Sequence, residues 1–213
     1  MSRAIERLCG NKDNSSNDFT DIYRLSVQAI DVGIHSRNHP YHLVSVANVG
    51  ASGFPEMRTV VLRYHDSEAR EVAFHADRRS PKINDLNINN KISFLMYDPE
   101  AKVQLRLKGH ATIHHKDQFA DKQWENTRQS SKYSYLNAAG SGVAVADRRS
   151  CDVDMQAMSM QADALDSVAY EQFAVVKCVY FIMDYTRLSP LGNERAILQW
   201  DEKGRMEGTW VVV

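Results

Sequence analysis

The spacing of apolar residues along the chain predicts one helix followed by many strands. Between Ile22 and Ile30 the apolar residues recur at helical spacing, which predicts a helix over residues 19–34. Pro40 disfavours helical backbone in the residue before it, so this helix is expected to end by that point. Residues 1–18 are mostly polar, and we expect them to form a flexible lead-in.

After residue 40 the apolar period becomes two, which is typical of β-strands. Strands are expected over residues 41–49, 56–64, 71–76, 91–97, 101–115, 173–185, 195–200 and 208–213. The segment 91–97 is apolar on both faces and is therefore expected to be a central strand. Helical segments are expected over residues 80–90, 117–127 and 154–172, with a long loop or loop–helix excursion over 128–153.

About eight strands, most of them joined by short turns, favour an antiparallel β-barrel with peripheral helices, a mainly β fold of the α+β class. A parallel α/β sheet is disfavoured because helices do not alternate regularly with the strands. Residues 19–213 are expected to form a single domain.

Composition and charge narrow the class of protein. The net charge of −1 argues against general nucleic-acid binding, and no apolar run approaches the roughly 20 residues of a membrane helix. We therefore expect neither nucleic acid nor membrane as a partner. The polar N-terminus does not resemble a signal peptide. Cys9, Cys151 and Cys178 are too far apart for a zinc or disulfide pattern, which favours a cytoplasmic protein.

Histidines and nucleophiles define no site by themselves. His110 and His114 share one face of a predicted strand at about 13 Å, too far apart for one metal ion, so no metal site is expected. No GxSxG, P-loop or GxGxxG motif occurs, and nothing marks a cysteine as activated. No catalytic residue is assigned.

Basic residues carry the remaining signal. Arg58 and Arg63 flank the strand core "RTVVLR", and the run "FHADRRSPK" (74–82) ends in cations where a helix is expected to begin. A helix N-terminus favours an anion, and arginine adds forked donors for phosphate. The simpler alternative is that Ser80 only caps a helix with Pro81 at its first position.

Arg58 and Arg63 have opposite parity, so a regular strand points them to opposite faces. They can serve one ligand only through a bulge, a strand end or a partner subunit.

The runs "RTVVLR", "FHADRRSPK" and "VQLRLKGHA" resemble, in order and spacing, the pyridoxamine 5′-phosphate oxidase-like family of FMN-binding split barrels. Members of that family carry an R-x-V-x-L-[KR] strand, an aromatic-rich strand ending in S-x-K, and a strand with Q-x-x-x-x-G. The likeness covers residues 40–115 and resumes over residues 173–213. It implies a homodimer of antiparallel Greek-key split barrels with FMN between the subunits.

The resemblance also implies site residues, carried over position by position. The implied FMN contacts are Arg58, Thr59, Val60, Val61, Leu62, Arg63, His75, Ala76, Arg79, Ser80, Lys82, Gln104, Tyr185 and Arg195. Among them, Ser80 and Lys82 are implied to lie at the phosphate, and Tyr185 stands where the oxidases have a flavin-contacting tryptophan. Arg63 and Ser130 are the implied substrate contacts.

The sequence departs from the family pattern at more of the substrate-binding positions than of the cofactor-binding positions. Pro81 stands where the oxidases usually have a second cation, for which Arg78 or Arg79 is a candidate substitute. Four substrate-binding residues of the oxidases fall here on Lys122, Asn126, Leu191 and Asn193. The closer match is the branch labelled pyridoxamine phosphate oxidase-related, which is similar in its D-x-R-S-P-K run and in a tryptophan, here Trp124, before a Ser/Tyr-rich loop.

These features lead to the hypothesis of an FMN-dependent oxidoreductase acting on a small molecule that the sequence does not define. Two alternatives stay open. One is a true pyridoxine or pyridoxamine 5′-phosphate oxidase with rearranged substrate contacts, and the other is a protein that binds FMN without turnover. A nucleic-acid-binding barrel is disfavoured by the near-zero net charge.

Overall fold

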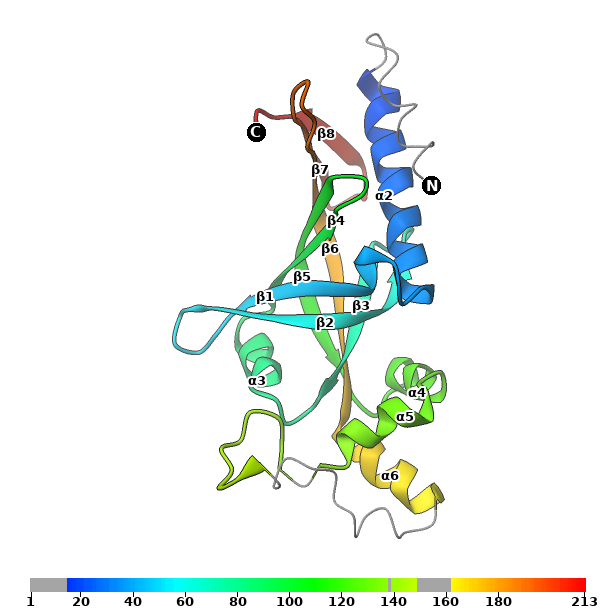
Figure 1. The fold of residues 1–213 in the computed structure, drawn as a ribbon, viewed down its shortest axis with the longest axis vertical. Coiled ribbons are helices and arrows are strands. Elements are labelled where there is room, and N and C mark those ends of the chain that lie inside the picture. The colour runs from blue at the N-terminus through cyan, green and yellow to red at the C-terminus, as the bar shows by residue number, and fades with distance from the viewer. Residues whose placement is uncertain (1–14, 138, 149–161) are drawn as a thin grey trace.

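A computed structural model describes residues 15–137, 139–148 and 162–213, and in this part of the chain an antiparallel sheet closes into a β-barrel (Figure 1). The strands are β1 (Leu43–Val49), β2 (Pro55–Asp66), β3 (Glu71–Asp77), β4 (Lys91–Asp98), β5 (Val103–His114), β6 (Phe173–Arg187), β7 (Glu194–Trp200) and β8 (Met206–Trp210). Their order is β3-β2-β1-β4-β5-β6-β7-β8, and β3 also pairs with β6, which closes the barrel. The expected antiparallel barrel is confirmed.

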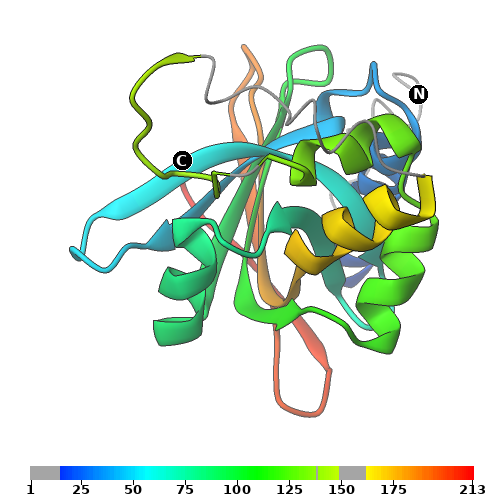
Figure 2. The same cartoon turned by 90° about the horizontal axis from the view of Figure 1, so that it is seen from below.

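Helices cover the ends and one side of the barrel. They are α2 (Ser15–His35), α3 (Pro81–Ile88), α4 (Gln118–Glu125), α5 (Gln129–Lys132) and α6 (Ala162–Gln172), with short 3-10 turns η2 (Pro40–His42) and η3 (Tyr133–Tyr135). Figure 2 shows α4, α5 and α6 gathered together, away from α3. None of the helices in the described ranges combines the length and apolar character needed to cross a bilayer.

Helix α2 begins at Ser15, inside the segment expected to be a flexible lead-in. Serine, asparagine and aspartate are favourable at a helix start, and Asp18 lies in the first turn, so the helix extends further towards the N-terminus than its apolar pattern. Residues 1–14 lie outside the described residues. The same holds for residues 154–161, the first part of the helix expected over residues 154–172.

Two clusters of buried side chains hold these elements together. The larger fills the barrel and includes Phe74, Phe94 and Leu105, all almost fully buried. The smaller lies between β3, β6 and the helices α4 and α6, where the Phe173 ring contacts Trp124 at 4.9 Å and Tyr135 at 5.4 Å. Burial of each such aromatic ring contributes about 1.5–3 kcal/mol, so the helical cluster is fixed onto the barrel by its own core.

Strand β4 lies between β1 and β5 as expected, but this chain covers only one of its faces. Ile92, Phe94 and Met96 are buried in the barrel. On the outer face, Leu95 and Tyr97 are 36% and 45% exposed. The expected central position of this strand is confirmed, and its outer face carries apolar side chains that the described residues leave partly exposed.

The β1–β2 hairpin projects from the barrel (Figure 1), and β2 contains a bulge further along. Leu62 pairs with Phe74 but Tyr64 pairs with Ala73, so Arg63 is an extra residue without a partner in the ladder. This is the irregularity that the opposite parity of Arg58 and Arg63 requires, because a bulge turns the side chain away from strict alternation.

Strand β5 has a second register shift, between Lys108 and Gly109. A Cβ atom on Gly109 would lie 2.2 Å from the Val179 carbonyl oxygen and 2.5 Å from the Cys178 sulfur. The glycine at the end of the Q-x-x-x-x-G run is thus required for the close approach of β5 and β6.

Replacing Gly109 by alanine is expected to lower the free energy of unfolding by about 1–3 kcal/mol, because the β6 backbone would have to move away. Urea unfolding followed by circular dichroism measures this. Thr112→Ala, at an exposed position of the same strand, is the control and should change stability by about 0.5 kcal/mol or less. Equal stability of the two variants would contradict the close approach.

Candidate functional site

A cleft of about 540 Å³ lies beside β2, the end of β3 and the segment around η3. The barrel and the start of α3 contribute Arg58, Thr59, Val60, Val61, Arg63, His75, Ala76, Asp77 and Lys82. The excursion after α4 contributes Ser131, Ser134, Tyr135 and Ser141. The fold therefore brings the runs "RTVVLR" and "FHADRRSPK" to one cavity, whose size is typical of a pocket for a small molecule or cofactor.

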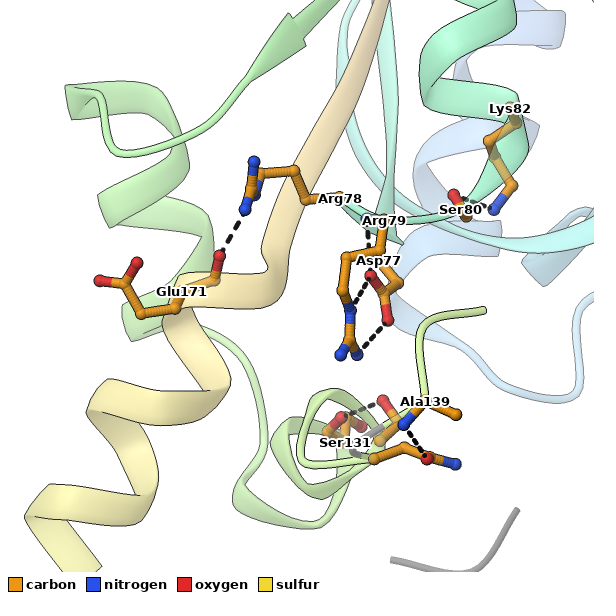
Figure 3. Close-up of polar contacts among 10 residues, drawn as sticks. Asp77, Arg78, Arg79, Ser80, Lys82, Ser131, Ala139 and Glu171 are labelled. Carbon is orange, nitrogen blue, oxygen red and sulfur yellow. Dashed lines mark hydrogen bonds and ion pairs between the residues drawn. The ribbon is translucent and has the colours of Figure 1, made fainter. Parts of the chain in front are cut away.

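Positive charge exceeds negative charge in this cleft. Arg58, Arg63 and Lys82 line it, and Asp77 is the acidic residue among its lining residues. The Asp77 carboxylate is already held by Arg79, whose Nε and terminal nitrogen donate to its two oxygens at 3.0 and 2.7 Å (Figure 3). Because this bidentate pair neutralises Asp77, the three lining cations remain available to an anionic ligand.

Helix α3 begins at the edge of the cleft. Ser80 is its N-cap residue and Pro81 opens the first turn, as the simpler alternative expected, but the Ser80 hydroxyl makes no capping hydrogen bond. It accepts instead from Lys82 Nζ at 2.9 Å. Burial lowers the pKa of Lys82, and the nearby charge of Arg58 lowers it further. An anion bound here would offset both effects.

Arg78 and Arg79, the candidate substitutes for the cation missing at Pro81, do not line the cleft. Arg78 is exposed, and its Nε donates to the Glu171 carbonyl oxygen at 3.4 Å, away from Lys82 (Figure 3). Arg79 is engaged with Asp77 and does not line the cleft. Within the run 77–82, Lys82 is the cation at the cavity.

Arg63, five residues along β2 from Arg58, also lines the cleft. Burial lowers its pKa; the Tyr135 hydroxyl opposes this effect, and the charges of Arg37 and Arg128 add to it. Arg37 follows α2 and Arg128 is the N-cap of α5, so three separate parts of the chain bring positive charge to one place.

His75 is held as a neutral imidazole. Its Nε2 lies 3.2 Å from Gln123 Oε1, and its ring packs edge-on against Phe173 at 4.8 Å. Burial lowers the pKa of His75 to about 4; the bond to Gln123 raises it, and the charge of Arg63 adds to the lowering. With Nε2–H donating to Gln123, Nδ1 is an acceptor. His75 is thus suited to binding rather than to proton transfer near neutral pH.

Three of the implied FMN contacts lie away from this cleft. Gln104 and Arg195 are on the outer face of the barrel, where Gln104 pairs with Thr186 and Thr186 with Arg195. Buried Asp184 accepts from Arg195 at 3.1 and 2.9 Å and also binds Arg106. Tyr185 points inward and lines a small cavity of about 30 Å³ beneath α2.

Two further implied contacts, Leu62 and Ser130, do not line the cleft. Four serine and tyrosine residues that were not among the implied contacts do line it. The Leu62 side chain is fully buried in the barrel core, and Ser130 is exposed on α5. Ser131, Ser134, Tyr135 and Ser141 line the cleft. For the first three, the signal was the Ser/Tyr-rich composition of "SSKYSY" (130–135), which has no period that shows which side chains face inward. Ser141 lies beyond that run.

The sequence of residues 26–115 matches the model of the pyridoxamine 5′-phosphate oxidase FMN-binding domain. This segment belongs to that family. The cofactor of the domain is FMN, and every barrel and α3 residue of the cleft lies within the matched segment. Among curated proteins, none matches this chain in sequence.

Solved structures share the fold of the chain. A pyridoxamine 5′-phosphate oxidase-related, FMN-binding protein from Nostoc punctiforme has a TM-score of 0.70 at 15% identity, covering 89% of this chain and 96% of its own. PhzG from Burkholderia lata, in complex with tetrahydrophenazine-1-carboxylic acid, has a TM-score of 0.68 at 16% identity, covering 90% and 91%. A Clostridium acetobutylicum protein related to general stress protein 26 has a TM-score of 0.52 at 15% identity, covering 81% and 92%.

The cleft residues fit FMN chemically. The start of α3 with Lys82 and Arg58 offers cationic donors suited to a phosphate, and the polar serine wall is suited to hydroxyl groups. Val60, Val61 and Ala76 provide apolar surface of the kind a flat ring system packs against.

The neutral state of His75 predicts a pH-dependent stability. The unfolded residue takes up a proton near its ordinary pKa of 6.5, whereas the folded one does so near pH 4. The stability it confers is therefore present above pH 6.5 and is lost as the pH falls towards 4, by about 3 kcal/mol in all.

His75→Gln is expected to remove most of that loss, so that its unfolding free energy changes less between pH 7 and pH 4.5 than that of the wild type. Urea unfolding at both values measures the difference. His110→Gln, at an exposed histidine on β5, is the control. If both variants follow the wild-type slope, His75 is not the group that titrates.

Proposed function

We propose that the protein is an FMN-dependent oxidoreductase, related to pyridoxamine 5′-phosphate oxidase, that works as a homodimer on a small molecule carrying an anionic group. The observation that carries the proposal is the surplus of cations in a cleft built from the FMN-binding segment. We also propose a cytoplasmic location, on the cysteine pattern of the sequence alone.

The cations of the cleft have different roles in this proposal. Lys82 and Arg58, which line the cleft, hold the phosphate of FMN at the start of α3, where the buried N-cap Ser80 accepts a hydrogen bond from Lys82. The strand segment 58–61 runs beside the cofactor. When bound, FMN supplies the redox chemistry, which the chain directs by placing its reactive ring against the substrate.

Arg63 binds the anionic group of the substrate in the same cleft. Arg37 and Arg128 raise the positive potential there, which favours a carboxylate or phosphate. The PhzG structure, which shares the fold, holds a carboxylic acid. His75, neutral beside Arg63, offers an acceptor without adding charge.

The substrate differs from pyridoxamine 5′-phosphate in this proposal. Lys122 and Asn126, at the positions of two substrate contacts in the oxidases, are exposed on or beside α4, and Asn126 donates to the Lys122 carbonyl oxygen at 2.8 Å. Leu191, at a third such position, is 99% exposed. None of the three lines the cleft.

The homodimer follows from the distance between the two groups of implied FMN contacts. Gln104 on β5 is three strands from β2, and Arg195 on β7 is also three strands from β2 by way of β3 and β6, so each strand lies about 14 Å away along the closed sheet. Neither residue lines the cleft that holds the other implied contacts. In the proposed dimer, Gln104 and Arg195 contact the FMN held mainly by the partner.

The outer face of the sheet suits such a partner. Register places Thr59, Ser45, Leu95 and Arg106 in one row across β2, β1, β4 and β5, so the cleft and the uncovered face of β4 are continuous. Met57, further along β2, is 64% exposed. Exposed apolar side chains grouped in this way are typical of an interface.

Purified protein is expected to be yellow or to take up added FMN, with the absorption bands of a bound flavin. Lys82→Ala should weaken FMN binding by about 10–100-fold, the effect of removing a charged hydrogen-bond donor. Fluorescence titration measures the affinity, with Lys91→Ala, an exposed lysine at the start of β4, as the control. A colourless protein that does not bind FMN would refute the proposal.

A turnover assay distinguishes an FMN-dependent enzyme from a protein that only binds FMN. Reduction of the bound flavin by NAD(P)H or by a candidate substrate, followed by reoxidation, supports the oxidoreductase. A yellow protein that no donor reduces supports the binding protein instead. Formation of pyridoxal phosphate from pyridoxamine phosphate would contradict the proposed change of substrate.

Leu95→Glu is expected to weaken the dimer by about tenfold or more, because it buries an unpaired charge in the interface. Sedimentation velocity over a concentration series measures this, and FMN affinity should fall in parallel. Val168→Glu, at a slightly more exposed apolar position on α6, is the control. A wild-type chain that remains monomeric at all concentrations would refute the homodimer.

A further inference from the structure

Two buried polar residues behind the cleft connect Arg58 to helix α3. Asn48 at the end of β1 is 4% exposed and Asp85 on α3 is 8% exposed, and neither lines the cavity. The Arg58 guanidinium donates to Asn48 Oδ1. Asn48 Nδ2 donates to Asp85 Oδ2 at 3.3 Å, and the backbone N–H of Ala51 donates to Asp85 Oδ1 at 3.2 Å.

The orientation of the Asn48 side-chain amide follows from these partners. An ionised carboxylate only accepts hydrogen bonds, and Asn48 Nδ2 lies between Asp85 and the Val49 carbonyl oxygen, which also only accepts. The amide nitrogen must therefore face Asp85, so the amide oxygen faces Arg58. By binding the amide nitrogen of Asn48, Asp85 ensures that the amide oxygen is free to accept the hydrogen bond from Arg58.

The negative charge of Asp85 also supports a connection to Arg58. Within the described part of the chain, Asp85 takes part in no ion pair, although a buried carboxylate needs compensation. Arg58, reached through the Asn48 amide, is the cation connected to it by hydrogen bonds. Arg58 and Lys82 also repel each other at the cleft. The carboxylate behind Arg58 holds it near Lys82 in spite of that repulsion.

We propose that Asp85, acting through Asn48, is the positioning residue for Arg58 and so sets the affinity of the cleft for the phosphate end of its cofactor. The relay also ties the β1–β2 hairpin to α3 through Ala51, so that the two cationic donors, which come from different elements, are held as one unit. This inference rests on the proposed binding of FMN in the cleft.

The test compares FMN with riboflavin, which has the same ring system but no phosphate. Asp85→Asn keeps the shape of the side chain but presents a donor to Asn48, whose amide must then rotate and turn its nitrogen towards Arg58. We expect FMN affinity to fall about tenfold, as for loss of a charge-assisted hydrogen bond, while riboflavin affinity stays within about twofold. Fluorescence titration measures both, and the thermal melting of the flavin-free protein reports folding.

The exchange variant N48D/D85N provides the rescue. It keeps composition and net charge, restores an acceptor for Arg58 at position 48, and allows the new asparagine at 85 to donate to it and to accept from Ala51. We expect FMN affinity within about threefold of the wild type. If Asp85→Asn alone does not fold, the FMN affinity of the exchange variant still tests the connection between Asp85, Asn48 and Arg58. Asp66→Asn, which removes a carboxylate from a turn at the end of β2, is the control.

The outcomes are distinct. Selective loss of FMN binding in Asp85→Asn with recovery in the exchange supports the relay. Equal loss of FMN and riboflavin, unchanged FMN affinity, or an exchange variant that folds but binds FMN no better than Asp85→Asn would overturn it. A wild type that binds neither flavin would refute the proposed function instead.

Discussion

The pairing of β3 with β6 is the interaction on which the rest of the structure depends. It joins residues 71–77 to residues 173–179 and closes the sheet into a barrel. Its last pair, Asp77 with Phe173, places the cation-rich run and the aromatic centre of the helical cluster at the same end. Both walls of the cleft are therefore positioned by one ladder, because side chains of α4, η3 and α6 pack against its final residues.

Much of the fold could be predicted from the sequence, because the period of apolar residues reports directly on backbone structure. The barrel strands lie where the alternation indicated, with ends shifted by a few residues. The apolar pattern of β4 correctly predicted a central strand, but such a pattern does not distinguish a face buried in one chain from a face left exposed. Leu95 and Tyr97 show that difference.

The candidate site was less accessible to sequence reasoning, because it depends on where side chains turn. The opposite parity of Arg58 and Arg63 predicted an irregularity in the strand if both bind one ligand. Only the β2–β3 pairing register shows that Arg63 itself is the extra residue of a bulge. Arg79 had the right chemistry for a phosphate, yet Asp77 lies two residues earlier and binds it. Asp85 and Asn48 gave no signal at all, because buried polar residues on a short helix and at a strand end resemble ordinary surface positions in the sequence.

The bulge at Arg63 has a consequence for how this site can change over evolutionary time. A residue outside the ladder contributes no cross-strand pair, so its side chain is under weaker structural constraint than its neighbours Leu62 and Tyr64. At the same time it lines the cleft proposed to receive the substrate. Substitutions at this position can alter ligand choice while the barrel that carries the cofactor stays intact, so one scaffold can diversify its chemistry through a single unpaired residue.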